Sequence, residues 1–296
     1  MLGKFIKFKC PECISIKHLS LFKDKTVIID ISIYLYKYKL QKSLLTNIYL
    51  MCSIFKYYNI NPLFVFDGYA GDEKNDELKR RREEKRSAKY EYYNILENNN
   101  VINDTMKVYL NKLEKKFIKI TKEDIKNVKN LLDSYGVSYY QADKEADELC
   151  AYLIHKKYGD IIISDDMDLF AYGCPVIVRH FDIVNRTCLS YDISVILSKL
   201  NMNISDFKWL CIFAGTDYNK NDKNIFYYYN KFKQLKSNET FKEILLGLSD
   251  NKEKLNYIFD VFSLSNNICY NMKKNETINK SELYMLLEKE NFIIIK

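Results

Sequence analysis

The chain has 296 residues, of which 47% are hydrophobic and 29% are charged, with only eight glycines and three prolines. This composition is that of a folded protein and excludes long disordered linkers. The net charge of +7 is compatible with nucleic-acid binding but does not by itself indicate it. No apolar run has membrane-spanning length, because the best candidate, TVIIDISIYLY, contains Asp30.

The N-terminal segment carries a C-x-x-C pair, Cys10 and Cys13, with His18 nearby. Such a pair can begin a zinc site, but no second close pair follows, so buried or incidental thiols are the favoured interpretation. The segment MLGKFIKFKC has no apolar signal-peptide region. We therefore expect reduced thiols in an intracellular protein.

Short apolar runs along the chain predict buried strands at Val27–Ile29, Leu63–Phe66, Ile161–Ile163 and Val176–Val178. Helical stretches lie between them, which indicates a parallel sheet covered by helices. Thr121 and Asp124 form a capping-box pattern, and Gly136 is placed to end the helix that follows. Residues 136–143 predict another strand, which leads into a helix over 144–159 that Gly159 would terminate.

The stretch from 74 to 89, KNDELKRRREEKRSAK, holds eight basic and four acidic side chains. One interpretation is a solvated helix with internal salt bridges, which is the usual role of such runs. The other is a basic helix that stands over an active site and contacts phosphates. Its position directly after Asp67 favours the second. After residue 217 the pattern predicts several short helices, and the final FIIIK fits either a short strand or a helix end.

Acidic residues follow three of the predicted strands, at Asp30, at Asp67 and at Asp165, Asp166 and Asp168. Ligand sites in open α/β sheets gather at the carboxyl ends of parallel strands. Singly, each has an ordinary explanation as a strand-end cap, a residue at a helix N-terminus or a turn former. Together they predict a shared site of seven carboxylates: Asp30, Asp67, Glu145, Asp147, Asp166, Asp168 and Asp217.

Seven carboxylates in one cleft would repel one another unless cations neutralised them. Oxygen ligands suit Mg²⁺ or Mn²⁺, and the presence of only three histidines argues against zinc. Two such ions can activate a water and stabilise the leaving oxygen of a phosphoryl displacement. The spacing of Asp166 and Asp168, two residues apart, lets both point toward one side of an extended or turning segment.

The segments IDISIYLYKY, FVFDG, DKEADELCAYL, SDDMDLFAYGCPVIVRH and AGTDY, in this order, resemble the flap endonuclease (XPG-type 5′-nuclease) family over roughly residues 25–220. The resemblance implies a PIN-like α/β fold: a central, mostly parallel sheet flanked by helices, a helical arch and a helical C-terminal region. It also implies an N-terminal nuclease half at 1–95, with the arch or gateway at 74–120. An internal nuclease half at 121–220 and a C-terminal region at 221–296 would follow.

The resemblance assigns roles to individual residues. The seven carboxylates fall on the family's positions for two Mg²⁺ ions, for which Mn²⁺ is a possible substitute, although Asp147 stands where the family usually has Glu. Lys74 and Arg81 match its two active-site cations, and their separation of seven residues is two helical turns. There they would offset charge that develops in the transition state. Tyr36 matches an aromatic residue that stacks on a base beside the cut; plain core packing is the alternative for this residue.

Three features depart from the family pattern. The chain begins Met-Leu-Gly rather than Met-Gly, and the stretch NKNDKNIFYYYN has no glycine where the family has a glycine-rich hairpin that grips duplex DNA. No clamp-binding motif is found near the C-terminus. The duplex-binding part is therefore predicted to be altered, and tethering to a sliding clamp is not predicted.

The activity that the resemblance implies is Mg²⁺-dependent hydrolysis of DNA phosphodiester bonds at 5′ flaps, nicks or junctions, in replication, repair or recombination. Branched or flapped DNA is the expected partner of a monomeric protein, and no membrane partner is expected. An RNA-cutting PIN-type nuclease and an inactive nuclease-like scaffold remain as alternatives. The AT-biased composition suits a large DNA virus or an AT-rich cellular genome, so the nucleus and a site of viral replication both stay open.

Overall fold

The computed structural model describes residues 2–69, 75–99, 101–219, 223–264, 268–275 and 277–292, without the side chains of 75–78. The chain forms two compact units. The first, here called the sheet unit, comprises Met1–Ile31, Cys52–Ala70 and Ser138–Lys274. The second, the helical unit, comprises Ser32–Met51, Gly71–Val137 and Asn275–Lys296. Lys74 lies outside the described residues.

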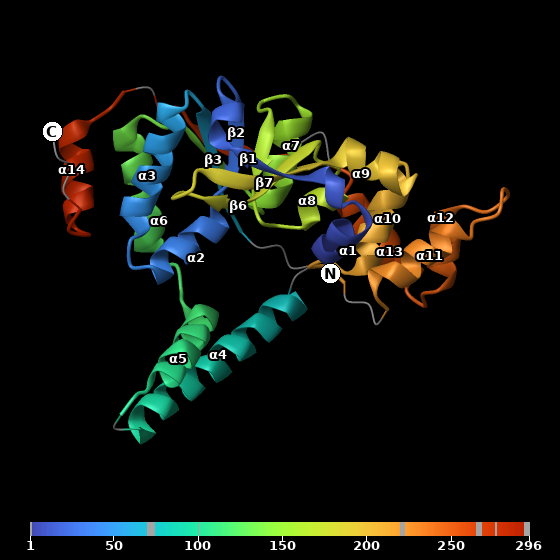
Figure 1. Cartoon of the computed structure of the whole chain (residues 1–296), viewed down its shortest axis with the longest axis horizontal. Helices are drawn as coiled ribbons and strands as arrows, with labels where there is room; N and C mark the ends of the chain where they lie inside the picture. The colour runs from blue at the N-terminus through green and yellow to red at the C-terminus, as the bar shows by residue number, and fades with distance from the viewer. Residues whose placement is uncertain are drawn as a thin grey trace. The chain divides into compact units, whose positions relative to one another are not determined.

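An eight-stranded mixed sheet forms the centre of the sheet unit, in the order β1-β7-β6-β5-β2-β3-β4-β8. Figure 1 shows β2, β3, β6 and β7 of this sheet. The five strands from β6 to β4 run parallel, and the outer strands join them antiparallel. This confirms the predicted α/β fold with a mostly parallel centre. The bounds are β1 (Ile14–His18), β2 (Thr26–Asp30), β3 (Asn61–Phe66), β4 (Tyr139–Ala142), β5 (Ile161–Ile163), β6 (Val176–Asp182), β7 (Thr187–Asp192) and β8 (Tyr270–Lys273).

The central strands are the ones that the apolar runs predicted. Val27, Ile28 and Ile29 of β2 are wholly buried, as expected for a parallel strand covered on both faces. The outer strands β1 and β8 are mostly exposed and carry no continuous apolar run, so the sequence did not reveal them. The prediction of several short helices after residue 217 was incomplete, because β8 also lies there and pairs with β4.

The sheet unit also contains helices that pack on the sheet. One of them, α7, contacts β2, β3, β4 and β5. The prediction that Gly159 ends α7 was wrong. The helix stops at His155, and Lys157 then adopts a left-handed conformation, with φ of 63°. Gly159 serves packing instead, because a Cβ there would lie 2.7 Å from the Ile28 side chain. The helices of this unit are α1 (Leu2–Lys9), α7 (Ala146–His155), α8 (Asp168–Ala171), α9 (Ile193–Leu200), α10 (Ile204–Ala214), α11 (Ile225–Lys233), α12 (Phe241–Gly247) and α13 (Lys252–Val261).

The described part of the helical unit contains α2 (Ser32–Leu40), the start of α3 (Leu44–Tyr57), α4 (Asn75–Asn98), α5 (Asp104–Phe117), α6 (Lys122–Tyr135) and α14 (Lys280–Glu288). The basic run lies in α4, which packs along α5 (Figure 1). Arg80 and Glu84 form an ion pair on α4, so part of the run acts as a salt-bridged helix surface. The capping box at Thr121 and Asp124 is confirmed, as is the end of α6 at Gly136, whose φ is 77°.

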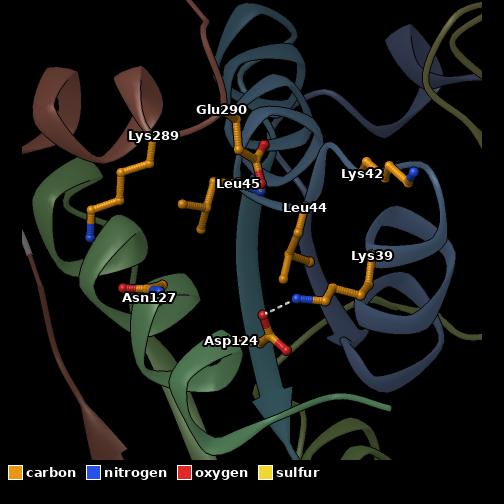
Figure 2. Close-up of a pocket in the computed structure, with 8 residues that line it drawn as sticks. All are labelled: Lys39, Lys42, Leu44, Leu45, Asp124, Asn127, Lys289 and Glu290. Carbon is orange, nitrogen blue, oxygen red and sulfur yellow. Dashed lines mark hydrogen bonds and ion pairs between the residues drawn. The ribbon is translucent and has the colours of Figure 1, made fainter. Parts of the chain in front are cut away.

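Side-chain bonds join the helices of this unit around a cavity of about 290 Å³ (Figure 2). The Glu290 carboxylate accepts hydrogen bonds from the backbone N–H groups of Leu45 and Thr46, both at 2.9 Å, and so satisfies the first turn of α3. Lys39 Nζ lies 2.6 Å from Asp124 Oδ1. Across the described ranges, no helix is both long and apolar enough to span a bilayer.

Candidate metal and nucleic-acid site

The parallel register of β2 and β5 places Asp30 beside Ser164. Ile29 pairs with Ile163, so the next residue of each chain segment leaves the sheet at the same edge. The Ser164 hydroxyl, which is completely buried, donates to Asp30 Oδ2 at 3.0 Å. Its oxygen accepts the backbone N–H of Asp166 at 3.1 Å. Ser164 therefore links two of the predicted site carboxylates.

Asp67 follows β3 and connects this edge to the start of α7. Its Oδ1 accepts the backbone N–H of Ala146 at 2.8 Å. The next residue, Gly68, donates its N–H to Lys144 O at 2.6 Å. A Cβ at Gly68 would lie 2.2 Å from Ala142 O, so only glycine fits this approach of two backbone segments.

Glu145 and Asp147 lie at the N-terminus of α7, as predicted. Glu145 takes the N-cap position without a side-chain capping bond, and the Tyr218 hydroxyl donates to its Oε2 at 3.4 Å. Asp147 is 7% exposed, and its Oδ1 accepts the N–H of Glu148 at 2.7 Å. Both carboxylates favour a helix N-terminus because the helix dipole is positive there.

Asp166, Asp168 and Asp217 are connected in series. The N–H of Asp168 donates to Asp166 Oδ1 at 2.7 Å, where α8 begins. The N–H of Asp217 in turn donates to Asp168 Oδ2 at 3.4 Å. The last contact joins residues 49 positions apart, so the turn after α10 is brought to the β5–α8 segment.

Asp165, unlike Asp166 and Asp168, is bonded to the neighbouring strand β6. Arg179 donates to its backbone oxygen at 2.7 Å, and the N–H of His180 donates to its Oδ1 at 2.7 Å. Both partners belong to β6, the strand beside β5. Asp165 thus anchors the segment that carries Asp166 and Asp168.

The carboxylates share one electrostatic environment. Burial raises the pKa of the Cys150 thiol well above its ordinary value, and the negative charges of Asp30 and Asp147 raise it further. Burial likewise raises the pKa of the Tyr172 hydroxyl, with added contributions from Asp147 and Asp168. Asp147 therefore acts on both buried side chains, while Asp30 acts on Cys150 and Asp168 acts on Tyr172.

Hydrogen bonds thus connect four of the predicted carboxylates: Asp30, Asp166, Asp168 and Asp217. Asp67, Glu145 and Asp147 are bonded instead to Ala146, Tyr218 and Glu148, at or near the start of α7. Within the described ranges, no three His, Cys, Asp or Glu side chains form a group that could hold a metal ion. The sequence interpretation did not identify Ser164 or Gly68 as functional. Ser164 begins the motif SDDMD, and Gly68 ends the motif FVFDG. In each motif a small residue stands next to an aspartate, and this pattern could have indicated a role at the site.

The remaining predicted residues belong to the helical unit. Tyr36 is 42% exposed on α2, and Lys85 Nζ of α4 lies 5.6 Å from the centre of its ring. Arg81 is exposed on α4.

The C-x-x-C pair forms a buried pair of thiols. Cys10 is completely buried and Cys13 is 5% exposed. Burial raises the pKa of Cys10 to about 12, and the neighbouring Cys13 adds to the effect. His18 is engaged with Ser20, at 2.9 Å from its hydroxyl. Cys10 and Cys13 are therefore packed in the core as protonated thiols.

Two family models match the chain: the XPG N-terminal domain over residues 2–88 and the XPG I-region over residues 136–217. Together they cover more than half of it. A probable RAD2-like endonuclease of Invertebrate iridescent virus 6 is 29% identical, over 74% of this chain and 66% of the relative. A flap endonuclease 1 of Enterocytozoon bieneusi (strain H348) is 24% identical, over 86% of this chain and 74% of the relative. The chain thus spans just under two thirds of the viral relative's length.

Solved structures share the fold. The catalytic core of Rad2 in complex with DNA substrate superposes with a TM-score of 0.67 at 20% identity, covering 97% of this chain and 94% of that one. At this level of identity the likeness concerns the fold.

Proposed function

This chain belongs to the XPG family, and we propose that it is a structure-specific DNA nuclease that hydrolyses phosphodiester bonds at 5′ flaps, nicks or junctions. The observation that carries the proposal is the linked set of carboxylates that follow β2 and β5, in which Ser164 joins Asp30 to Asp166. The named relatives are endonucleases, which supports the same reaction here. Replication, repair or recombination of DNA would be its setting.

The donor set supports a requirement for Mg²⁺, with Mn²⁺ as a substitute. The described side chains do not enclose an ion as they stand, so the fit rests on their chemistry: the seven predicted donors are carboxylates, which hard divalent cations prefer. Asp30 and Asp168 are each 8% exposed, and a divalent cation would reduce the cost of burying their charges. The set proposed to hold two ions is Asp30, Asp67, Glu145, Asp147, Asp166, Asp168 and Asp217. Bound ions would polarise the phosphoryl oxygens and lower the pKa of a water.

The protein's own contribution is orientation. The Ser164 hydroxyl fixes one oxygen of Asp30, and the N–H of Ala146 fixes one oxygen of Asp67. Carboxylates held in this way lose little rotamer freedom when they act, so less binding energy is needed to order the site. The Tyr218 hydroxyl does the same for Glu145.

We assign the helical unit a part in holding the substrate. Arg81, with Lys74, would offset negative charge on the scissile phosphate. Tyr36 would stack on a base, and its 42% exposure is compatible with that role. The Rad2 core was solved with a DNA substrate, which supports DNA as the polymer. We propose that the protein works as a monomer without a sliding clamp.

The decisive test compares cleavage of a labelled 5′-flap DNA with that of a matched RNA flap, in Mg²⁺ and in EDTA. Wild type should cut the DNA flap only with the metal. Asp168→Asn should lose more activity than the roughly 10–100-fold typical of outer-shell partners. Asp192→Asn is the matched control, because Asp192 caps α9 and Asn is an equally good cap. A wild type that cuts only RNA, or no branched substrate with either ion, would contradict the proposal.

A further inference from the structure

Tyr69 is an exposed aromatic residue on a fixed backbone. It follows Asp67 by two residues, and 77% of its surface is exposed. Its N–H donates to Asp143 O at 2.9 Å, beside the bond from Gly68 to Lys144. Among the described residues, its ring forms no aromatic or cation–π pair. The backbone is therefore rigid while the ring is available.

The segment that holds Tyr69 also leads to the candidate site. Asp143 and Lys144, which accept the two backbone bonds, directly precede Glu145. The same two residues line a cavity of about 160 Å³ with Glu145 and with the apolar side chains of Leu149 and Ile268. Tyr69 thus lies in the chain beside one carboxylate of the site and is bonded to the segment carrying another.

The charges around Tyr69 decide which ligand suits its ring. Asp67 precedes Tyr69 by two residues, and Asp143, Lys144 and Glu145 form the segment to which its backbone is bonded, so three of the four described charged residues here are acidic. Such a surface repels an acidic peptide, and a phosphate needs neutralising cations to approach it. The flat, uncharged face of a nucleobase meets no such penalty, and stacking on tyrosine accepts any base. Because the backbone of Tyr69 is already held by hydrogen bonds, less conformational entropy is lost when a base binds.

We infer that Tyr69 is a stacking platform for a single-stranded nucleobase beside the phosphodiester that is cut. The inference rests on the proposed function and deepens it by naming a substrate-positioning residue that the sequence motifs did not indicate. The competing interpretation is an ordinary surface tyrosine, one of 25 tyrosines in the chain.

The test removes the ring and the base separately. Flap substrates carry an abasic site at one position at a time near the cut, and kcat/KM is measured for wild type, Tyr69→Ala and Tyr69→Trp. Tyr57→Ala is the matched control, because Tyr57 is also 77% exposed. On intact DNA, Tyr69→Ala should lower kcat/KM by roughly 5- to 100-fold, mostly through KM, and Tyr69→Trp should restore it. At one abasic position, wild type and Tyr69→Ala should become equal, since the two losses are one interaction.

A binding readout without cleavage separates this inference from the proposed function. Flap DNA with 2-aminopurine at that position is titrated with each protein in EDTA and in Ca²⁺. Quenching by wild type and by Tyr69→Trp, with loss in Tyr69→Ala, supports the platform even if no cleavage is found. Equal quenching and equal kcat/KM for wild type and Tyr69→Ala, in a protein that cuts flaps, would overturn it. An equal loss in Tyr57→Ala would overturn it as well.

Discussion

Gly68 is the residue at which the structure makes its sharpest prediction about the site. An alanine Cβ would lie 2.2 Å from Ala142 O and 2.3 Å from Asp143 O, and both are backbone atoms. Gly68→Ala must therefore push the two segments apart. That movement breaks the bonds from Gly68 N to Lys144 O, at 2.6 Å, and from Tyr69 N to Asp143 O, at 2.9 Å.

The expected cost follows from those two bonds. Each contributes about 0.5–1.5 kcal/mol, so Gly68→Ala should lower the free energy of unfolding by about 1–3 kcal/mol. For a chain of this size the Tm should fall by about 2–6 °C. Cleavage should fall by more than this loss of stability alone would cause. The reason is that Asp67 directly precedes Gly68, and its Oδ1 accepts the N–H of Ala146 at 2.8 Å. A displacement of about 1 Å at a catalytic group costs roughly 100-fold in rate.

The assay combines urea unfolding, followed by circular dichroism, with cleavage of a flap substrate in Mg²⁺. Gly247→Ala is the matched control, because a Cβ at the end of α12 meets nothing within 4 Å. This change should raise the free energy of unfolding by about 0.4–1 kcal/mol and leave cleavage unchanged. A Gly68→Ala protein that unfolds and cuts like wild type would refute the reasoning that this backbone contact sets the site.

Two further changes test the carboxylate bonds. Ser164→Ala removes the hydroxyl that donates to Asp30, so kcat/KM should fall roughly 10- to 100-fold and the Mg²⁺ concentration for half-maximal cleavage should rise. An equal loss in Ser190→Ala, which removes another buried serine, would mean a general packing effect. In the helical unit, burial tends to raise the pKa of Asp124, but hydrogen bonds, led by that from Lys39, hold it below its ordinary value. The ionised Asp124 therefore stabilises the fold fully above the pKa that it has in the unfolded chain. This stabilisation is lost as the pH falls through its lower pKa in the folded protein. The unfolding free energies of wild type and Asp124→Asn should differ at pH 7 and converge toward pH 3; a constant difference would contradict the assignment.

The central strands were predictable because their patterns are local. A buried parallel strand must be apolar along its length, and β2 and β5 show this in three consecutive residues each. The carboxylates that follow such strands were recognisable for the same reason. The end of α7 was mispredicted because a left-handed Lys157 took the role that glycine usually has, while Gly159 was required by contact with Ile28.

The chain's sequence by itself determined which side chains are candidates for the site: acidic groups placed where strands end and helices begin. Only the tertiary structure decided how they are joined. The bond from Ser164 to Asp30 spans 134 positions in the chain, and that from Ala146 to Asp67 spans 79. The reason is physical. A strand's composition specifies that it is buried, but the order and register of parallel strands depend on which surfaces pack together across the whole sheet.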